Sequence, residues 1–165
     1  MIAIVAVDEK WGIGRNNSLL FSVPEDMKFF RQTTTGKTII VGRKTLESFP
    51  SSKPLKNRVN IVLSSSMSFE GAVCVKNLTE LFEEIKKYNR DEVFVCGGAS
   101  VYKMLLPYCD KAFVTKIHAD GNADTFFPNL DADSNWSLAK VRKEKSGELN
   151  VDFCTYENRN VETLG

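Results

Sequence analysis

Short apolar runs and amphipathic segments alternate along most of the chain. Most of the apolar runs are uninterrupted, as expected of strands whose two faces are both covered. They span residues 2–7, 38–42, 59–63, 92–96 and 112–117. Helical patterns lie between them: residues 78–88 carry one apolar stripe, and residues 99–106 end before a proline. Strands that alternate with helices predict a mostly parallel sheet between two helical layers.

The C-terminal part follows a different pattern. Residues 136–144 and 149–157 alternate apolar and polar positions and are joined by residues 145–148, so they predict an antiparallel hairpin at the sheet edge. The sequence contains no repeat and no linker-like stretch. We therefore expect one domain over residues 1–158, followed by a frayed tail over residues 159–165.

A further helix is predicted to begin near Val23, because residues 22–25 match the S-x-x-E capping box. Asp26 then falls close to the apolar arc that Val23, Met27 and Phe30 form. An acid in the first turn commonly complements the helix dipole. The alternative is a carboxylate that faces a pocket, with a pKa raised by poor solvation, and that can bind or protonate a ligand.

Thr115 bears on that choice. It shares a strand face with Phe113 and Ile117, so its hydroxyl points into an apolar region. A buried hydroxyl needs a hydrogen-bond partner. A backbone carbonyl would serve, and so would the carboxylate of Asp26 across a pocket.

Composition narrows the class of protein. The chain has 165 residues, 42% of them hydrophobic and 26% charged, which is typical of one globular domain and excludes a disordered chain. A net charge of +1 gives no field that recruits nucleic acid or an anionic membrane. No apolar run reaches membrane-spanning length, and the apolar start lacks a basic leader, so it reads as a first strand.

The cysteines and the single histidine do not suggest a metal site or a catalytic nucleophile. The four cysteines are scattered and favour reduced thiols in a cytoplasmic protein over a disulfide framework or a zinc site. They are Cys74, Cys96, Cys109 and Cys154. His118, the single histidine, shares a strand side with Lys116, and we expect it at the surface. No metal site is predicted.

Two strand-to-helix junctions carry glycine. One has Gly97 and Gly98; the other has Gly42, followed by an Arg-Lys-Thr run at residues 43–45. Each alone fits a plain tight turn, but the two together favour a ligand with a pyrophosphate. The hydroxyls at residues 64–66, after a third strand, fit either another phosphate contact or a polar loop.

Two loops could contribute to a ligand-binding site. The glycines at residues 11–17 lack the third glycine of a dinucleotide fingerprint, so we expect a mobile lid there. Arg58 follows a loop with proline and lysine and could bind a carboxylate with its guanidinium fork. A solvated loop arginine is the alternative.

Taken in order, these segments resemble dihydrofolate reductase of the bacterial single-domain type over nearly the whole chain. The motifs are I-x-A, V-P-x-D-x-x-x-F, V-G-R-K-T-x-E-S-F, P-L-x-x-R, V-x-G-G, V-T-x-I and D-T-x-F-P. The resemblance implies an α/β fold with three layers: a mostly parallel eight-stranded sheet, an antiparallel C-terminal hairpin and about four flanking helices. It also implies a cytoplasmic monomer that reduces dihydrofolate with NADPH and is an antifolate target of one-carbon metabolism.

The resemblance further implies roles for single residues. Asp26 would promote protonation of the pterin N5, with Thr115 bracing it and Phe21 beside the proton route. Arg58 would bind the glutamate α-carboxylate, and the Gly97–Gly98 peptide would be cis. The other substrate residues would be Ile4, Val5, Ala6, Met27, Phe30, Phe49, Leu55 and Cys96. The cofactor would be held by Ala6, Ile13, Gly14, Gly42, Arg43, Lys44, Thr45, Ser64, Ser65, Ser66, Cys96, Gly97, Gly98, Ala99, Ser100, Val101 and Tyr102.

Three positions depart from the family pattern. Leu20 and Phe21 replace proline and tryptophan, so the indole N–H that normally holds a water is lost. Ser100 stands where many relatives have an arginine over the 2′-phosphate, and Cys96 replaces an aliphatic residue. Two alternatives to this function are a reductase of a related pterin or ribosylated pyrimidine, as in the riboflavin pathway, and a non-catalytic dinucleotide-binding module.

Overall fold

The computed structural model describes residues 1–66 and 68–164, and Gly165 of the predicted tail lies outside this part. Its helices are α1 (Pro24–Thr34), α2 (Arg43–Glu47), α3 (Leu78–Ile85) and α4 (Ala99–Leu105). Its strands are β1 (Ile2–Val7), β2 (Gly12–Gly14), β3 (Thr38–Gly42), β4 (Val59–Leu63), β5 (Val73–Val75), β6 (Val93–Val95), β7 (Lys111–Ile117), β8 (Thr125–Phe126), β9 (Trp136–Ser146) and β10 (Leu149–Asn158).

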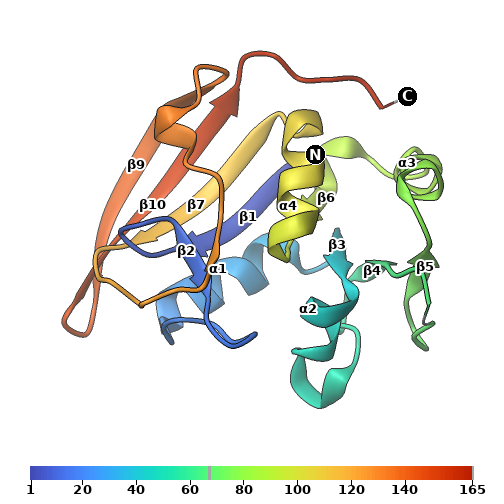
Figure 1. The fold of residues 1–165 in the computed structure, drawn as a ribbon, viewed down its shortest axis with the longest axis horizontal. Helices are drawn as coiled ribbons and strands as arrows, with labels where there is room; N and C mark the ends of the chain where they lie inside the picture. Colours follow the sequence, from blue (N-terminus) through green and yellow to red (C-terminus); the bar gives the residue numbers. More distant parts are fainter. Residues whose placement is uncertain (67, 165) are drawn as a thin grey trace.

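An eight-stranded sheet runs through the molecule in the order β5-β4-β3-β6-β1-β7-β10-β9 (Figure 1). All pairings from β5 to β7 are parallel, whereas β10 is antiparallel to both β7 and β9. β9 and β10 form the expected hairpin at one edge, and Gly147 in its turn has a φ of +60°, which favours glycine. The predicted fold class is confirmed.

The side chains of β1 show how the layers form. Ala3, Val5 and Val7 belong to one buried cluster with residues of α3 and α4. Ile2 and Ile4 point to the other face and pack against the phenylalanines of α1. Because successive strand residues face opposite sides, one apolar run serves two cores. α2 lies on the same face as α1, since Leu46 packs on Val41 and Val62.

The predicted capping box is wrong. α1 begins at Pro24, its N-cap is Val23, and no side chain caps it. The Glu25 carboxylate instead accepts a hydrogen bond from the Ser146 hydroxyl at the distant hairpin. A helix that starts one residue later moves Glu25 out of the third helical position that the box requires.

The C-terminal tail packs against distant parts of the chain. In the described part of the tail, the Glu162 N–H donates to the Pro107 carbonyl at 2.9 Å, and Leu164 packs against the main buried cluster.

The short strands β2, β5 and β8 were not predicted as such. Within residues 1–66 and 68–164, no helix has the length and apolar character that a membrane span needs.

Candidate active site

The Asp26 carboxylate lies at the start of α1, where the helix crosses β7. The Thr115 hydroxyl donates a hydrogen bond of 2.6 Å to Asp26 Oδ1. Thr115 is 2% exposed, so this carboxylate supplies the partner that its buried hydroxyl requires. Burial raises the pKa of Asp26, and the hydrogen bond from Thr115 offsets part of that rise.

A small cavity opens beside this carboxylate. Its volume is about 50 Å³, whereas pockets that hold organic ligands measure roughly 300–1,000 Å³. The segment of residues 19–21 forms part of its wall, and Leu19 is 79% exposed. A bicyclic ring needs more room than this cavity has. The lining comprises Ala6, Ile13, Leu19, Leu20, Phe21, Val23, Asp26, Met27 and Ile117.

The glycine loop before this wall is tied to the β7–β8 connection. Asp8 is 3% exposed, and its carboxylate accepts hydrogen bonds from the N–H groups of Gly12 and Gly121. Further along, the Asn16 N–H donates to the Asp124 carboxylate at 2.9 Å. Both Ile13 and Gly14 lie in β2, which pairs with β8. These contacts fix the glycine loop against the β7–β8 connection, and Ile13 of the loop lines the cavity.

The sheet separates next to the cavity. β1 pairs with β6 only at Ile2 and Ala3, while its pairing with β7 continues to Val7. The Ile4 carbonyl, beyond the last β6 pair, accepts a hydrogen bond of 2.7 Å from the Tyr102 hydroxyl of α4. Val5 points away into the α3/α4 core, so only its backbone can border this gap.

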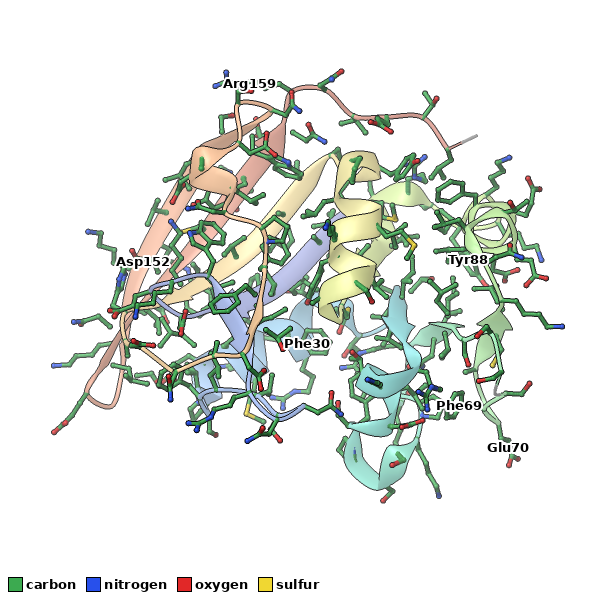
Figure 2. The ribbon with its side chains drawn as sticks, viewed as in Figure 1. Phe30, Phe69, Glu70, Tyr88, Asp152 and Arg159 are labelled. Atoms are coloured by element: carbon green, nitrogen blue, oxygen red, sulfur yellow. The ribbon has the colours of Figure 1, made fainter. Side chains whose placement is uncertain are left out.

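An apolar wall extends from the gap toward the far end of α1. Figure 2 shows Phe30 on α1 near the middle of the molecule. Seven predicted substrate residues differ in exposure here: Met27 is 57% exposed, Ala6 is half-buried, and the other five belong to one cluster. That cluster contains Ile4, Phe30, Phe49, Leu55 and Cys96. Burial raises the pKa of the Cys96 thiol, which is therefore held protonated.

Arg58 lies at the open end of this wall. Its Nε donates to Thr34 Oγ1 at 2.8 Å, and one terminal nitrogen donates to the Lys56 carbonyl at 2.9 Å. The guanidinium carbon is 5.8 Å from the centre of the Phe30 ring. Burial lowers the pKa of Arg58 from its ordinary value, and nearby Arg31 adds to that effect.

Asn60 was missed by the sequence analysis. It is 2% exposed in β4, and its side-chain amide bonds both the N–H and the carbonyl of Leu55 and also the carbonyl of Arg58. The available signal was a polar residue within the apolar run at residues 59–63, because a buried amide must find partners. Asn60 thus fixes the loop that carries two predicted substrate residues.

The two glycine junctions meet, as the parallel sheet requires. The Gly42 N–H donates to the Gly97 carbonyl at 2.9 Å, and the peptide between Gly97 and Gly98 is cis. A Cβ on Gly42 would lie 3.2 Å from a Val101 methyl, and one on Gly98 would lie 3.3 Å from Thr45 Oγ1. Side chains are therefore excluded where the backbone segments approach each other.

Polar groups surround these junctions. Arg43 forms an ion pair of 3.0 Å with Glu47, and Lys44 is exposed. Ser65 and Ser66 are exposed after β4, but Ser64 is 7% exposed and its N–H donates to the Val75 carbonyl. Of the first helical residues of α4, Ala99 is half-buried and Ser100 is exposed.

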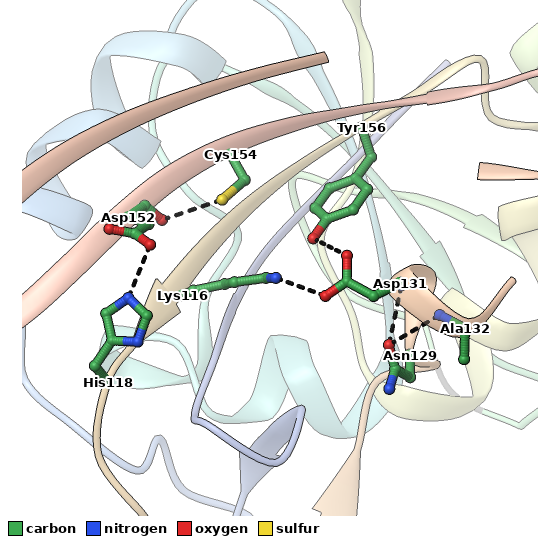
Figure 3. Close-up of polar contacts among 8 residues, drawn as sticks. All are labelled: Lys116, His118, Asn129, Asp131, Ala132, Asp152, Cys154 and Tyr156. Atoms are coloured by element: carbon green, nitrogen blue, oxygen red, sulfur yellow. Dashed lines mark hydrogen bonds and ion pairs between the residues drawn. The ribbon is translucent and has the colours of Figure 1, made fainter. Parts of the chain in front are cut away.

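Other polar groups lie away from Asp26. His118 is exposed, as predicted, and its Nε2 is 2.8 Å from Asp152 Oδ2 (Figure 3). Lys116 and Tyr156 both bond the Asp131 carboxylate. In the described part of the chain, no group of three or more histidine, cysteine or acidic side chains could hold a metal ion.

A second cavity, of about 490 Å³, lies elsewhere. Tyr88 in its wall lies at the α3 end of the molecule, far from the Phe30 position in Figure 2. It shares no lining residue with the cavity beside Asp26. Its wall consists of Lys86, Tyr88, Arg90, Val161, Glu162, Thr163 and Leu164.

The chain is similar to known proteins over nearly its whole length. A family model described as dihydrofolate reductase matches residues 1–158. The dihydrofolate reductase of Bacillus subtilis (strain 168) is 36% identical over 98% of this chain and 96% of its own length. That of Staphylococcus haemolyticus is 38% identical over 93% of each chain.

A solved structure supports the same assignment. Dihydrofolate reductase from Enterococcus faecalis, complexed with NADP(H) and RAB-propyl, is 35% identical and superimposes with a TM-score of 0.85 over 95% of each chain. The resemblance noted in the sequence thus extends to the order and pairing of the strands. The chain belongs to the dihydrofolate reductase family.

Proposed function

We propose that this protein reduces 7,8-dihydrofolate to 5,6,7,8-tetrahydrofolate with NADPH as the hydride donor, and that Asp26 promotes protonation of the pterin N5. Family membership supports the reaction. The observation that carries the role of Asp26 is its hydrogen bond to Thr115 beside an apolar cavity. In this proposal the carboxyl is the hydrogen-bonding partner of the amino-pyrimidine edge of the pterin.

The raised pKa of Asp26 suits this task. A carboxyl group whose proton is retained closer to neutral pH can favour the protonated form of a bound heterocycle. Thr115 holds Oδ1 in place and leaves Oδ2 for the ligand. Phe21 has no donor to hold a water at the neighbouring position, so the proton route depends on Asp26 and on solvent that enters past residues 19–21.

The apolar wall suits the aminobenzoyl part of the substrate, and Arg58 suits its carboxylate. Three guanidinium N–H groups of Arg58 are used by Thr34, Thr35 and Lys56. One N–H remains on each terminal nitrogen. A guanidinium binds a carboxylate through such N–H donors.

The glycine junctions suit NADPH, which supplies the hydride when it is bound. Gly42 and Gly98 are half-buried and have no side chain that would keep a ligand from their backbone, and a side chain at Gly97 would be strained because its φ is +125°. Arg43 and Lys44 supply positive charge for phosphates. Thr45, Ser65 and Ser66 supply hydroxyls, whereas buried Ser64 contributes through its position in the loop.

Substrate-dependent oxidation of NADPH tests the function. The purified protein should consume NADPH in the presence of dihydrofolate, which the absorbance of the reduced nicotinamide reports. Consumption with a ribosylated pyrimidine and none with dihydrofolate would identify the related reductase instead. NADPH binding without turnover on either substrate would identify a non-catalytic module.

We place the protein in the cytoplasm. All four cysteines are free thiols, and Cys109 and Cys154 are buried without a disulfide partner, which suits a reducing compartment. Fractionation of the source cells with an antibody to the protein tests this location, and recovery in the extracellular fraction would contradict it.

A further inference from the structure

We propose that Thr34 is a positioning residue that aims the guanidinium fork of Arg58 and so sets the preference for substrates with a carboxylate tail over tail-less pterins. The inference rests on the proposed function, because it concerns the same substrate. Thr34 is the last residue of α1 and does not border the cavity beside Asp26. It acts through Arg58.

The direction of each hydrogen bond at Thr34 is settled by the chemistry of its partners. The hydroxyl donates to the Phe30 carbonyl at 2.8 Å, since a carbonyl can only accept. It accepts from Arg58 Nε at 2.8 Å, since a guanidinium can only donate. Thr34 is 0% exposed, so no water can take over either contact without a rearrangement.

The remaining contacts of the guanidinium complete its alignment. One terminal nitrogen donates to the Lys56 carbonyl at 2.9 Å, and the other makes a longer contact of 3.4 Å with Thr35 Oγ1. The Phe30 ring lies on one side of the guanidinium at 5.8 Å. Because the guanidinium is planar, fixing Nε also fixes the plane in which the two outward N–H groups lie.

This alignment is in place before a ligand arrives. An arginine side chain has many rotamers, and a flexible one would lose much of that freedom on binding a carboxylate. The bonds to Thr34 and Lys56 hold the side chain in advance, and Asn60 holds the backbone of Arg58. Preorganisation of this kind increases affinity without adding a contact to the ligand.

Removing the Thr34 hydroxyl should therefore weaken the binding of substrates that carry a carboxylate tail and leave tail-less substrates unaffected. Thr34→Val keeps the shape of the side chain but leaves Arg58 Nε without its acceptor. We expect KM for dihydrofolate to rise about tenfold, equivalent to about 1.4 kcal/mol, with little change in kcat, because the charged guanidinium loses a hydrogen-bond acceptor that holds it in place. A 7,8-dihydropterin with a methyl group in place of the tail does not reach Arg58, so its kcat/KM should stay unchanged.

The test measures kcat/KM for both substrates in wild type, Thr34→Val, Thr34→Ser and Thr35→Val, with thermal melting as the folding control. Thr34→Ser keeps the hydroxyl and should restore the wild-type ratio of the two values to within about threefold. Thr35→Val removes the longer contact and should change the ratio less than Thr34→Val does. If Thr34→Val does not fold, Thr34→Ala provides the same comparison.

Three outcomes would overturn the inference: an unchanged ratio in Thr34→Val, an equal loss on both substrates, or a failure of Thr34→Ser to restore the ratio. A wild-type protein that reduces neither substrate would instead overturn the proposed function. The two failures are thus distinguishable in one set of measurements.

Discussion

Replacing Thr115 with valine isolates the hydrogen bond that holds Asp26. The bond is 2.6 Å long and joins a buried hydroxyl to a carboxylate, a type worth about 1.5–3 kcal/mol. Because Thr115 stabilises the charged form of Asp26, its loss should raise the pKa of that carboxyl further. At about 1.4 kcal/mol per tenfold change, the midpoint of the pH–rate profile should move up by roughly one to two pH units.

The same substitution should reduce stability in a pH-dependent way. Burial raises the pKa of Asp26 in the folded state above its value in the unfolded state. The contribution of this group to the free energy of unfolding is therefore fully present below the unfolded-state pKa. It is lost as the pH rises through the folded-state pKa. Without Thr115, the ionised carboxylate is less well satisfied, so the loss in the free energy of unfolding should be larger at neutral than at acid pH.

The assay is kcat/KM for dihydrofolate against pH, together with urea unfolding at two pH values. Thr155→Val is a matched control, because Thr155 lies on β10 and pairs with Phe113 rather than contacting Asp26. A Thr115→Val profile that superimposes on the wild-type profile would refute the idea that this hydroxyl tunes Asp26. A shift to lower pH would refute the assigned sign.

Three further substitutions test other parts of the site. Phe21→Trp restores an indole N–H donor beside the cavity and should raise kcat or shift its pH dependence; an identical pH–rate profile would remove the basis for a slower proton route. Ser100→Arg, at an exposed position on α4, should raise the ratio of kcat/KM for NADPH over NADH by about tenfold or more, as measured with both cofactors, whereas a constant ratio would count against a phosphate contact here. Asn60→Ala removes three hydrogen bonds to the Leu55–Arg58 loop, so it should lower the free energy of unfolding by about 1–3 kcal/mol and raise KM for dihydrofolate. Urea unfolding measures the first effect and steady-state kinetics the second. A wild-type KM in this variant would show that the loop does not depend on the Asn60 amide.

The central sheet could be predicted from the sequence, because parallel strands covered on both faces have nearly continuous apolar runs. Asp26 could also be named as a candidate partner of Thr115, because alternation along β7 directs the Thr115 hydroxyl into an apolar region, where the hydroxyl needs a polar partner. The hydrogen-bond geometry bears this out. The sequence pattern could not reveal β2 or β5, because three residues are too few to show a period.

Long-range partners account for the other differences. Glu25 looked like a capping residue, but it bonds Ser146, 121 positions away, and local spacing contains no information about that contact. The roles of Thr34 and Asn60 likewise depend on Arg58 and Leu55 being brought beside them by the packing of α1 against β3 and β4. Ser64 was predicted to offer its hydroxyl to a phosphate, yet it is buried, because the chain is still bonded to Val75 at that point.

The narrow cavity beside Asp26 has a similar cause. Leu20 is packed closely against Gly121, where an added Cβ would lie 2.8 Å from two Leu20 carbons. The sequence indicated a mobile glycine loop but not the position in which the loop rests.

The central claim is that Asp26 supplies the acid function of the site, and the pH dependence of Asp26→Asn tests it most directly. Asparagine keeps the size of the side chain and can still accept from Thr115, but it cannot exchange a proton. We expect turnover of dihydrofolate with NADPH to fall by roughly 10²–10⁴-fold at neutral pH and to recover partly at low pH, where the substrate arrives already protonated. Wild-type turnover in Asp26→Asn at neutral pH, or a loss that is equal at every pH, would contradict the account.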